Sequence, residues 1–281
     1  MSHSHKKPVL GHIHVPKTGG FSFRRLLGDC YGPAHVDLYF ANSTTFVYEE
    51  HALAELVGCQ SVRAFSSHFV RRFPAVLANR PIHYVTFLRE PVSQFISYVA
   101  YTRKYYRAIQ DTVLLSHLPP DMPDLSIREC ARWILSGSDT TFRNFRENYT
   151  TNFFARYPLF DAHRFEYADR AYRAARLSTA QLILGRFLLV GITEQMDESY
   201  SVLRRSAAEI GIELPNAAVP FENVTGGLDE SLTWIGEDDE VGAKMLNSLR
   251  EDTLLYRWAL NRLREARPAF VGLATATAHS I

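Results

Sequence analysis

The sequence predicts an α/β fold, a single domain with a mainly parallel central sheet flanked by helices. Two apolar runs, at residues 10–15 and 82–88, are each followed by a short loop and a stretch of helical character. A third apolar run, at residues 187–192, repeats this order. The 281 residues are 46% hydrophobic and 22% charged, which is ordinary globular composition. We expect one domain over residues 8–265, between a flexible N-terminus at residues 1–7 and a frayed tail at residues 266–281.

The first predicted unit is a strand, a glycine loop and a helix. Ile13 and Val15 suit a buried strand, and Pro16 ends it. Gly19 and Gly20 permit backbone angles that other residues resist. A helix is expected over residues 21–31, with its N-terminus directed at the loop.

This loop has the composition of an anion-binding site. Backbone N–H groups and a helix N-terminus converge there, Lys17 adds a positive charge, and Thr18 and Ser22 add hydroxyl donors. In a Walker loop the lysine follows the glycines, whereas Lys17 precedes them, which disfavours a nucleoside triphosphatase. The expected ligand group is a phosphate or a sulfate.

The string Pro-Lys-Thr-Gly-Gly-Phe-Ser at residues 16–22 resembles the phosphosulfate-binding loop of sulfotransferases that use 3′-phosphoadenosine 5′-phosphosulfate (PAPS). It is closest to the carbohydrate-type family that includes heparan sulfate 2-O-sulfotransferase, and the resemblance covers roughly residues 8–260. It implies that this P-loop-like segment binds the 5′-phosphosulfate, with Phe21 where the family usually has Thr or Ser. The implied ligands are Lys17, Thr18, Gly19, Gly20, Phe21 and Ser22.

The next expected elements are a helix near residues 49–57 and a strand over residues 62–69, which runs into a loop at His68. The resembled 2-O-sulfotransferases carry His-Gly-His in this loop, and Ser66-Ser67-His68 keeps only the second histidine. The resemblance implies that His68 removes the proton from the acceptor hydroxyl. An imidazole with a pKa near 6.5 suits that role. His12, His14 and His83 lie within predicted strands, so we expect them in the interior.

The strand at residues 82–88 is followed by Arg89 and by a helix from Pro91 to about residue 106. In the resembled family an arginine and a serine at these places hold the 3′-phosphate of the nucleotide. Arg89 can form a forked contact with two phosphate oxygens. Ser97 lies eight residues on, which places it near the same helix face as Arg89.

The remaining chain is mainly helical, with a helix expected at about residues 125–135. After the strand at residues 187–192, Thr193 and Glu194 are expected to cap the following helix. The segment 222–227 resembles a loop that closes over the nucleotide in the family, which implies contacts from Asn223 and Thr225. Residues 236–264 are expected to form one long amphipathic helix.

Charge and cysteine content narrow the function classes. A net charge of +1 does not favour nucleic-acid or membrane-surface binding, and three cysteines without metal-like spacing predict no metal site. No window reaches the roughly 18–20 apolar residues of a membrane span. We therefore expect a soluble, cytoplasmic protein.

The function predicted from these features is an enzyme, a PAPS-dependent sulfotransferase acting on a hydroxyl of a carbohydrate or glycolipid. His68 is the expected base, and Lys17 is expected to stabilise the leaving phosphate. Two alternatives remain open. A P-loop-like nucleotide kinase or hydrolase needs a magnesium-binding carboxylate beside the loop, where Glu90 is close. A non-catalytic PAPS- or carbohydrate-binding module would tolerate the loss of His68.

Overall fold

The computed structural model describes residues 7–38, 50–70, 72–106, 119–137, 146–159, 170–220 and 232–266. Apart from residues 7 and 266, the two chain ends that the sequence predicts to be flexible lie outside these ranges. So do Asn223 and Thr225. None of the helices within these ranges has the length and apolar character needed to cross a membrane.

The described residues form one six-stranded sheet with the order β2-β3-β1-β5-β4, in which β6 also pairs with β5. Every pairing is parallel except that of β4 with β5. The predicted α/β class with a mainly parallel sheet is therefore confirmed. The strands are β1 (Val9–Ile13), β2 (His35–Asp37), β3 (Ala64–Ser67), β4 (Val76–Leu77), β5 (Arg80–Leu88) and β6 (Leu189–Ile192).

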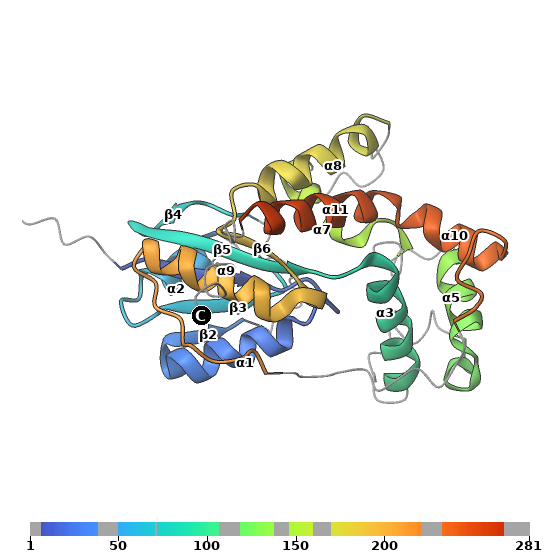
Figure 1. Ribbon diagram of the computed structural model, residues 1–281, viewed down its shortest axis with the longest axis horizontal. Coiled ribbons are helices and arrows are strands. Elements are labelled where there is room, and N and C mark those ends of the chain that lie inside the picture. The colour runs from blue at the N-terminus through green and yellow to red at the C-terminus, as the bar shows by residue number, and fades with distance from the viewer. Residues whose placement is uncertain are drawn as a thin grey trace, which may run out of the picture.

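Helices cover both faces of this sheet. Helices α1 and α9 lie on one face, and α7, α8 and α11 lie on the other (Figure 1). The aromatic contacts agree, since Phe23 of α1 packs against Phe87 of β5, while Phe154 of α7 packs against Phe187 next to Tyr84. The helices are α1 (Gly20–Tyr31), α2 (Glu50–Gly58), α3 (Pro91–Tyr105), α5 (Ile127–Ser136), α7 (Tyr149–Leu159), α8 (Arg170–Leu184), α9 (Met196–Glu209), α10 (Glu240–Ser248) and α11 (Arg250–Glu265).

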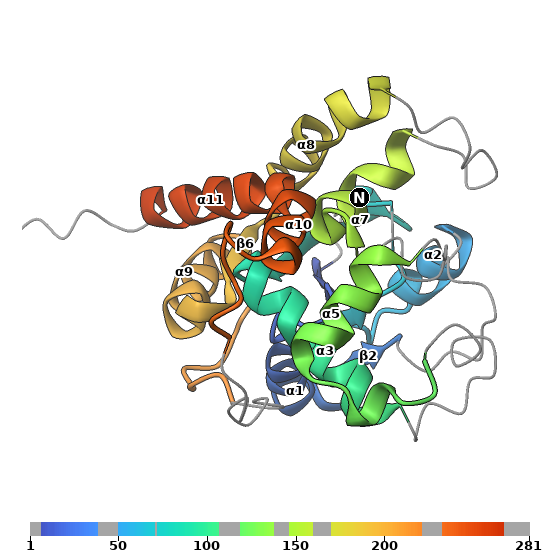
Figure 2. The same ribbon diagram turned by 90° about the vertical axis from the view of Figure 1, so that its right-hand side faces the viewer.

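A second hydrophobic cluster lies beyond the end of the sheet. Helix α3 leaves β5 and packs with α5 and α10, as Figures 1 and 2 show. Val99, Ile134 and Met245 are fully buried in this cluster. It is separate from the core around the sheet and holds α3 in place from the side opposite to the strands.

The prediction of one helix over residues 236–264 is wrong, because the segment forms α10 and α11 with a break at Leu249. The side chain of Asn148 explains the break. Its Oδ1 accepts hydrogen bonds from the backbone N–H groups of Glu251 (2.7 Å) and Asp252 (3.1 Å), so it caps the N-terminus of α11 from another part of the chain.

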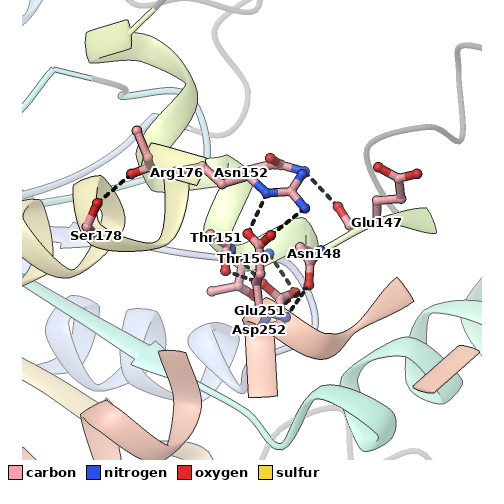
Figure 3. Close-up of polar contacts among 10 residues, drawn as sticks. Glu147, Asn148, Thr150, Thr151, Asn152, Arg176, Ser178, Glu251 and Asp252 are labelled. Atoms are coloured by element: carbon pink, nitrogen blue, oxygen red, sulfur yellow. Dashed lines mark hydrogen bonds and ion pairs between the residues drawn. The ribbon is translucent and has the colours of Figure 1, made fainter. Parts of the chain in front are cut away.

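The capping is reciprocal (Figure 3). The carboxylate of Asp252 accepts hydrogen bonds from the backbone N–H groups of Thr150 and Thr151, at 3.0 and 2.7 Å, in the first turn of α7. It also accepts one from the Thr151 hydroxyl at 2.7 Å. The N-terminus of α7 is therefore capped from α11, and that of α11 from the residue just before α7, which fixes the two helices against each other.

Candidate active site

The carboxyl ends of four parallel strands lie side by side at one edge of the sheet. Ile13 at the end of β1 pairs with Ser67 of β3, and Leu88 at the end of β5 pairs with Ile192 of β6. This is the edge where open α/β sheets bind ligands. The segments that follow these ends carry His68, Lys17, Arg89 and Thr193.

The loop between β1 and α1, together with the first turn of α1, has the backbone of an anion-binding site. We call this segment, residues 16–22, the cradle. Lys17 and Gly19 both have positive φ angles, of 67° and 75°. Helix α1 begins at Gly20 with no side-chain cap and no acidic residue in its first turn. No carboxylate of its own first turn therefore competes for its first N–H groups, which fits a phosphate or sulfate group at this place.

Both glycines of the loop are required by their surroundings. A Cβ atom at Gly20 would lie 1.9 Å from Cδ2 of His14, so only glycine fits there. At Gly19 a Cβ atom would lie 3.1 Å from Met196 and from Thr193, and the φ of 75° also disfavours a side chain.

The hydroxyl of Thr18 does not face a ligand, contrary to the prediction. Thr18 is 1% exposed, and its Oγ1 donates to the carbonyl of Val15 at 2.8 Å. Its backbone N–H is the group it can offer to an anion. Ser22 is also buried, at 6% exposed, and its backbone N–H donates to the carbonyl of Gly19. Phe21 is 39% exposed at the start of α1.

Lys17 is half-buried, and its Nζ lies 4.3 Å above the ring of Tyr101 on α3. Burial, and secondly the charge of Arg89, lowers the pKa of Lys17 to about 8. Nη1 of Arg89 donates to the carbonyl of Lys17 at 3.3 Å, so the two cations meet at the cradle.

Ser97 is 5% exposed within α3. The helix-face argument that paired it with Arg89 does not apply, because α3 begins at Pro91 and Arg89 precedes it. The direct connection of β5 to α3 is what keeps these two residues in one region.

Thr193 and Glu194 do not cap the next helix as predicted, since the N-cap of α9 is Gln195 and receives no side-chain hydrogen bond. The Thr193 hydroxyl instead lies between two backbone carbonyls, at 2.7 Å from that of Thr18 and 3.0 Å from that of Leu88. These contacts tie the ends of β1, β5 and β6 together at the cradle.

His68 is half-buried directly after β3, and its Nδ1 lies 2.6 Å from the carbonyl oxygen of His14. A carbonyl oxygen only accepts, so Nδ1 carries the proton and Nε2 is the basic nitrogen of the neutral ring. The turn is held by Ser67, whose Oγ accepts from the backbone N–H of Phe69 at 2.9 Å.

The carboxylate of Glu90, the residue after Arg89, is occupied by helix capping. Its two carboxylate oxygens accept from the backbone N–H groups of Val92 (3.1 Å) and Ser93 (2.7 Å). Within the part of the chain that the structure describes, no group of three or more His, Cys, Asp or Glu side chains is arranged to hold a metal ion.

Two residues near the cradle have roles that sequence reasoning missed. Gln94 donates from Nε2 to the carbonyl of Pro16 at 2.8 Å and accepts at Oε1 from the hydroxyl of Thr150 at 3.0 Å, so it links the cradle to α7. Asp252 is 3% exposed, and burial raises its pKa to about 6. The only sequence signal for the role of Gln94 was its polar side chain among the apolar residues of α3.

These residues line a small pocket between the cradle, α3 and the start of α11. Its lining combines aromatic residues with Lys17 and Asp252. The lining residues are Pro16, Lys17, Pro91, Gln94, Phe95, Tyr98, Tyr149, Leu249 and Asp252.

No family model matches the chain, and no curated protein matches it either.

Proposed function

We propose that this protein is a sulfotransferase that moves a sulfuryl group from PAPS to a hydroxyl of a carbohydrate or glycolipid acceptor. The supporting observation is that Lys17, Arg89 and His68 follow three adjacent parallel strands, β1, β5 and β3, and so lie at one edge of the sheet. These three residues lie far apart in the sequence, and the strand order β3-β1-β5 brings the segments that carry them to the same edge of the sheet, which supports a shared site.

The cradle residues are suited to the nucleotide. The uncapped first turn of α1 offers N–H groups to the 5′-phosphosulfate, and Lys17 contributes a charge next to it. Arg89, whose guanidinium already contacts the cradle backbone, is assigned to the 3′-phosphate together with Ser97. PAPS supplies an activated sulfuryl group, joined to its 5′-phosphate through a bridging oxygen.

The protein then has two tasks in the transfer step. His68 accepts the acceptor hydroxyl proton at Nε2 as the new S–O bond forms, because its Nδ1–H is directed at the His14 carbonyl. The bond from sulfur to the bridging oxygen breaks, and Lys17 neutralises the charge that develops on the leaving phosphate. Positioning supplies most of the remaining acceleration, as in phosphoryl transfer.

The capping role of Glu90 argues against the kinase or hydrolase alternative. Both of its oxygens accept backbone hydrogen bonds, and using them for magnesium would uncap α3. No comparable observation favours a non-catalytic binding module.

The test is transfer of label from ³⁵S-PAPS to a panel of glycans and glycolipids. Wild type is expected to label at least one acceptor, His68→Ala to lose roughly 10²–10⁴-fold in turnover while keeping nucleotide binding, and Lys17→Ala to lose both. Arg205→Ala, on the exposed side of α9, is the control. Transfer of phosphate from ATP and magnesium would contradict the proposal, and nucleotide binding without transfer to any acceptor would favour the binding module.

A further inference from the structure

His14 occupies the space between the cradle and the proposed base. It follows β1 directly, is 1% exposed, and its backbone N–H donates to the carbonyl of Ser67 at 2.9 Å. Its ring is stacked on the ring of His68, with centroids 4.2 Å apart and planes inclined by 29°. The same residue also provides the carbonyl that receives the Nδ1–H of His68.

The other contacts of this ring are with the cradle. Cδ2 of His14 would lie 1.9 Å from a Cβ atom at Gly20, so the ring lies directly against the cradle backbone. The ring of Phe21 meets it edge to face, with centroids 5.2 Å apart. His14 therefore touches the phosphate-binding segment on one side and the base on the other.

His14 and its neighbour His12 stay neutral. Burial, first of all, lowers the pKa of both rings well below the ordinary value, and nearby positive charge adds to this. The charged or titratable groups that act on the two rings are His35, His68, Arg24 and Lys17. A neutral His14 ring places no positive charge against the stacked ring of His68.

We propose that His14 is a positioning residue for the base: its carbonyl fixes the Nδ1–H tautomer of His68, and its ring fixes the distance of His68 from the cradle. This inference rests on the proposed function, in which Nε2 of His68 must face the acceptor hydroxyl next to the transferred sulfuryl group. A reacting group displaced by about 1 Å loses on the order of 10²-fold in rate.

The first experiment reads the tautomer without any activity. Long-range ¹H–¹⁵N spectra of the full chain with ¹⁵N-labelled histidine, assigned by comparison with His68→Gln, report which nitrogen of His68 is protonated. The expected result for wild type is a proton on Nδ1 at a pH where the ring is neutral. A proton on Nε2 would overturn the inference, and the readout is a property of the wild type that requires no activity assay.

The second experiment separates the ring of His14 from its backbone carbonyl. His14→Ala keeps the carbonyl and removes the stacked ring, and it is expected to lower kcat by about 10–100-fold, with KM for PAPS changed by less than about threefold. His14→Phe restores an aromatic ring and is expected to recover most of kcat. His83→Ala, at a half-buried histidine of β5 outside the site, is the control.

The outcomes distinguish this inference from the function on which it rests. A fully active His68→Ala would remove the proposed base, and the role of His14 with it, but would leave sulfuryl transfer in place. A wild type that binds the nucleotide and labels no acceptor would instead remove the proposed function. Loss of activity in His68→Ala together with a wild-type kcat in His14→Ala would overturn only the role of His14. Failure of His14→Phe to restore turnover, in a folded variant that binds the nucleotide normally, would also overturn it.

Discussion

Lys17 combines two uncommon properties for a lysine. Its φ of 67° lies in the left-handed region, which costs on the order of 1 kcal/mol for a residue with a side chain. Its ammonium group is partly removed from water and lies beside a second cation, Arg89, which lowers its pKa. An anion bound in the cradle would be attracted to Lys17 and to Arg89. It would therefore offset both the removal of the Lys17 ammonium from water and its repulsion by Arg89.

The lowered pKa leads to a prediction about nucleotide binding. With a pKa of about 8 in the free protein, Lys17 loses its proton as the pH rises through 8, and a neutral amine attracts phosphate less. Calorimetric affinity for 3′-phosphoadenosine 5′-phosphate is expected to fall above this pH by up to about tenfold per unit. Lys17→Arg, which stays charged, should remove this decline. A decline that persists unchanged in Lys17→Arg would assign it to another group.

At the scale of elements, the geometry of the site depends on the side-chain contacts that hold the ends of β1, β5 and β6 together. The hydroxyl of Thr193 lies within hydrogen-bond distance of the carbonyls of Thr18 and Leu88, which belong to two other segments of the chain. No local pattern in the sequence could indicate these contacts. The prediction that Thr193 caps the following helix was wrong, because capping was inferred from position along the chain alone.

Thr193→Val keeps the shape of the side chain and removes its hydroxyl. The expected result is a loss of about 1–2 kcal/mol in the free energy of unfolding, together with weaker binding of the bisphosphate nucleotide, since the cradle loses its tie to β6. Urea denaturation and calorimetry measure the two effects. Thr253→Val is the matched control, because its hydroxyl donates to the carbonyl of Leu249 within a helical segment. Equal nucleotide affinity in both variants would contradict the role given to Thr193.

The strand–loop–helix units were predictable because their signals are local. Apolar runs, glycines and a proline at a helix start lie next to one another in the sequence, and they identified β1, β3, β5 and β6 with the helices after β1 and β5. β2 and β4 are three and two residues long, too short for a periodic pattern. The break between α10 and α11 depends on Asn148, about a hundred residues away.

In the candidate site, too, the features with local sequence signals could be predicted and those that depend on distant contacts could not. Lys17, Arg89 and His68 stand in recognisable positions after strands, and parallel strand ends share an edge, so their proximity could be predicted. The direction of the Thr18 hydroxyl, the link made by Gln94 and the packing of His14 against Gly20 could not. Each of these depends on which side chain meets which backbone after the layers have packed.

At the scale of the whole molecule, Asp252 links α11 to the first turn of α7, and its raised pKa is expected to make stability depend on pH. Its pKa in the folded state, about 6, lies above the ordinary 3.8, so the folded protein binds this proton more tightly than the unfolded chain. The resulting stabilisation is complete below pH 3.8 and is lost as the pH rises through about 6.

Asp252→Asn cannot titrate and is expected to lack this dependence. The difference in free energy of unfolding between wild type and variant should change by about 2 kcal/mol between about pH 4 and pH 7. Urea denaturation at the two values measures it. Asp197→Asn, an exposed aspartate in the first turn of α9, is the control for the charge change itself. A constant difference at both pH values would show that Asp252 titrates normally.

The central claim is that the strand ends of β1 and β5 together bind one nucleotide with phosphates at both its 3′ and 5′ positions. Calorimetry of wild type and Arg89→Ala with 3′-phosphoadenosine 5′-phosphate and with adenosine 5′-monophosphate tests it directly. We expect wild type to prefer the bisphosphate by about 2–3 kcal/mol, the order of a charge-assisted forked contact, and Arg89→Ala to lose most of that preference. Equal affinity of the wild type for the two nucleotides, or an unchanged preference in Arg89→Ala, would contradict the account.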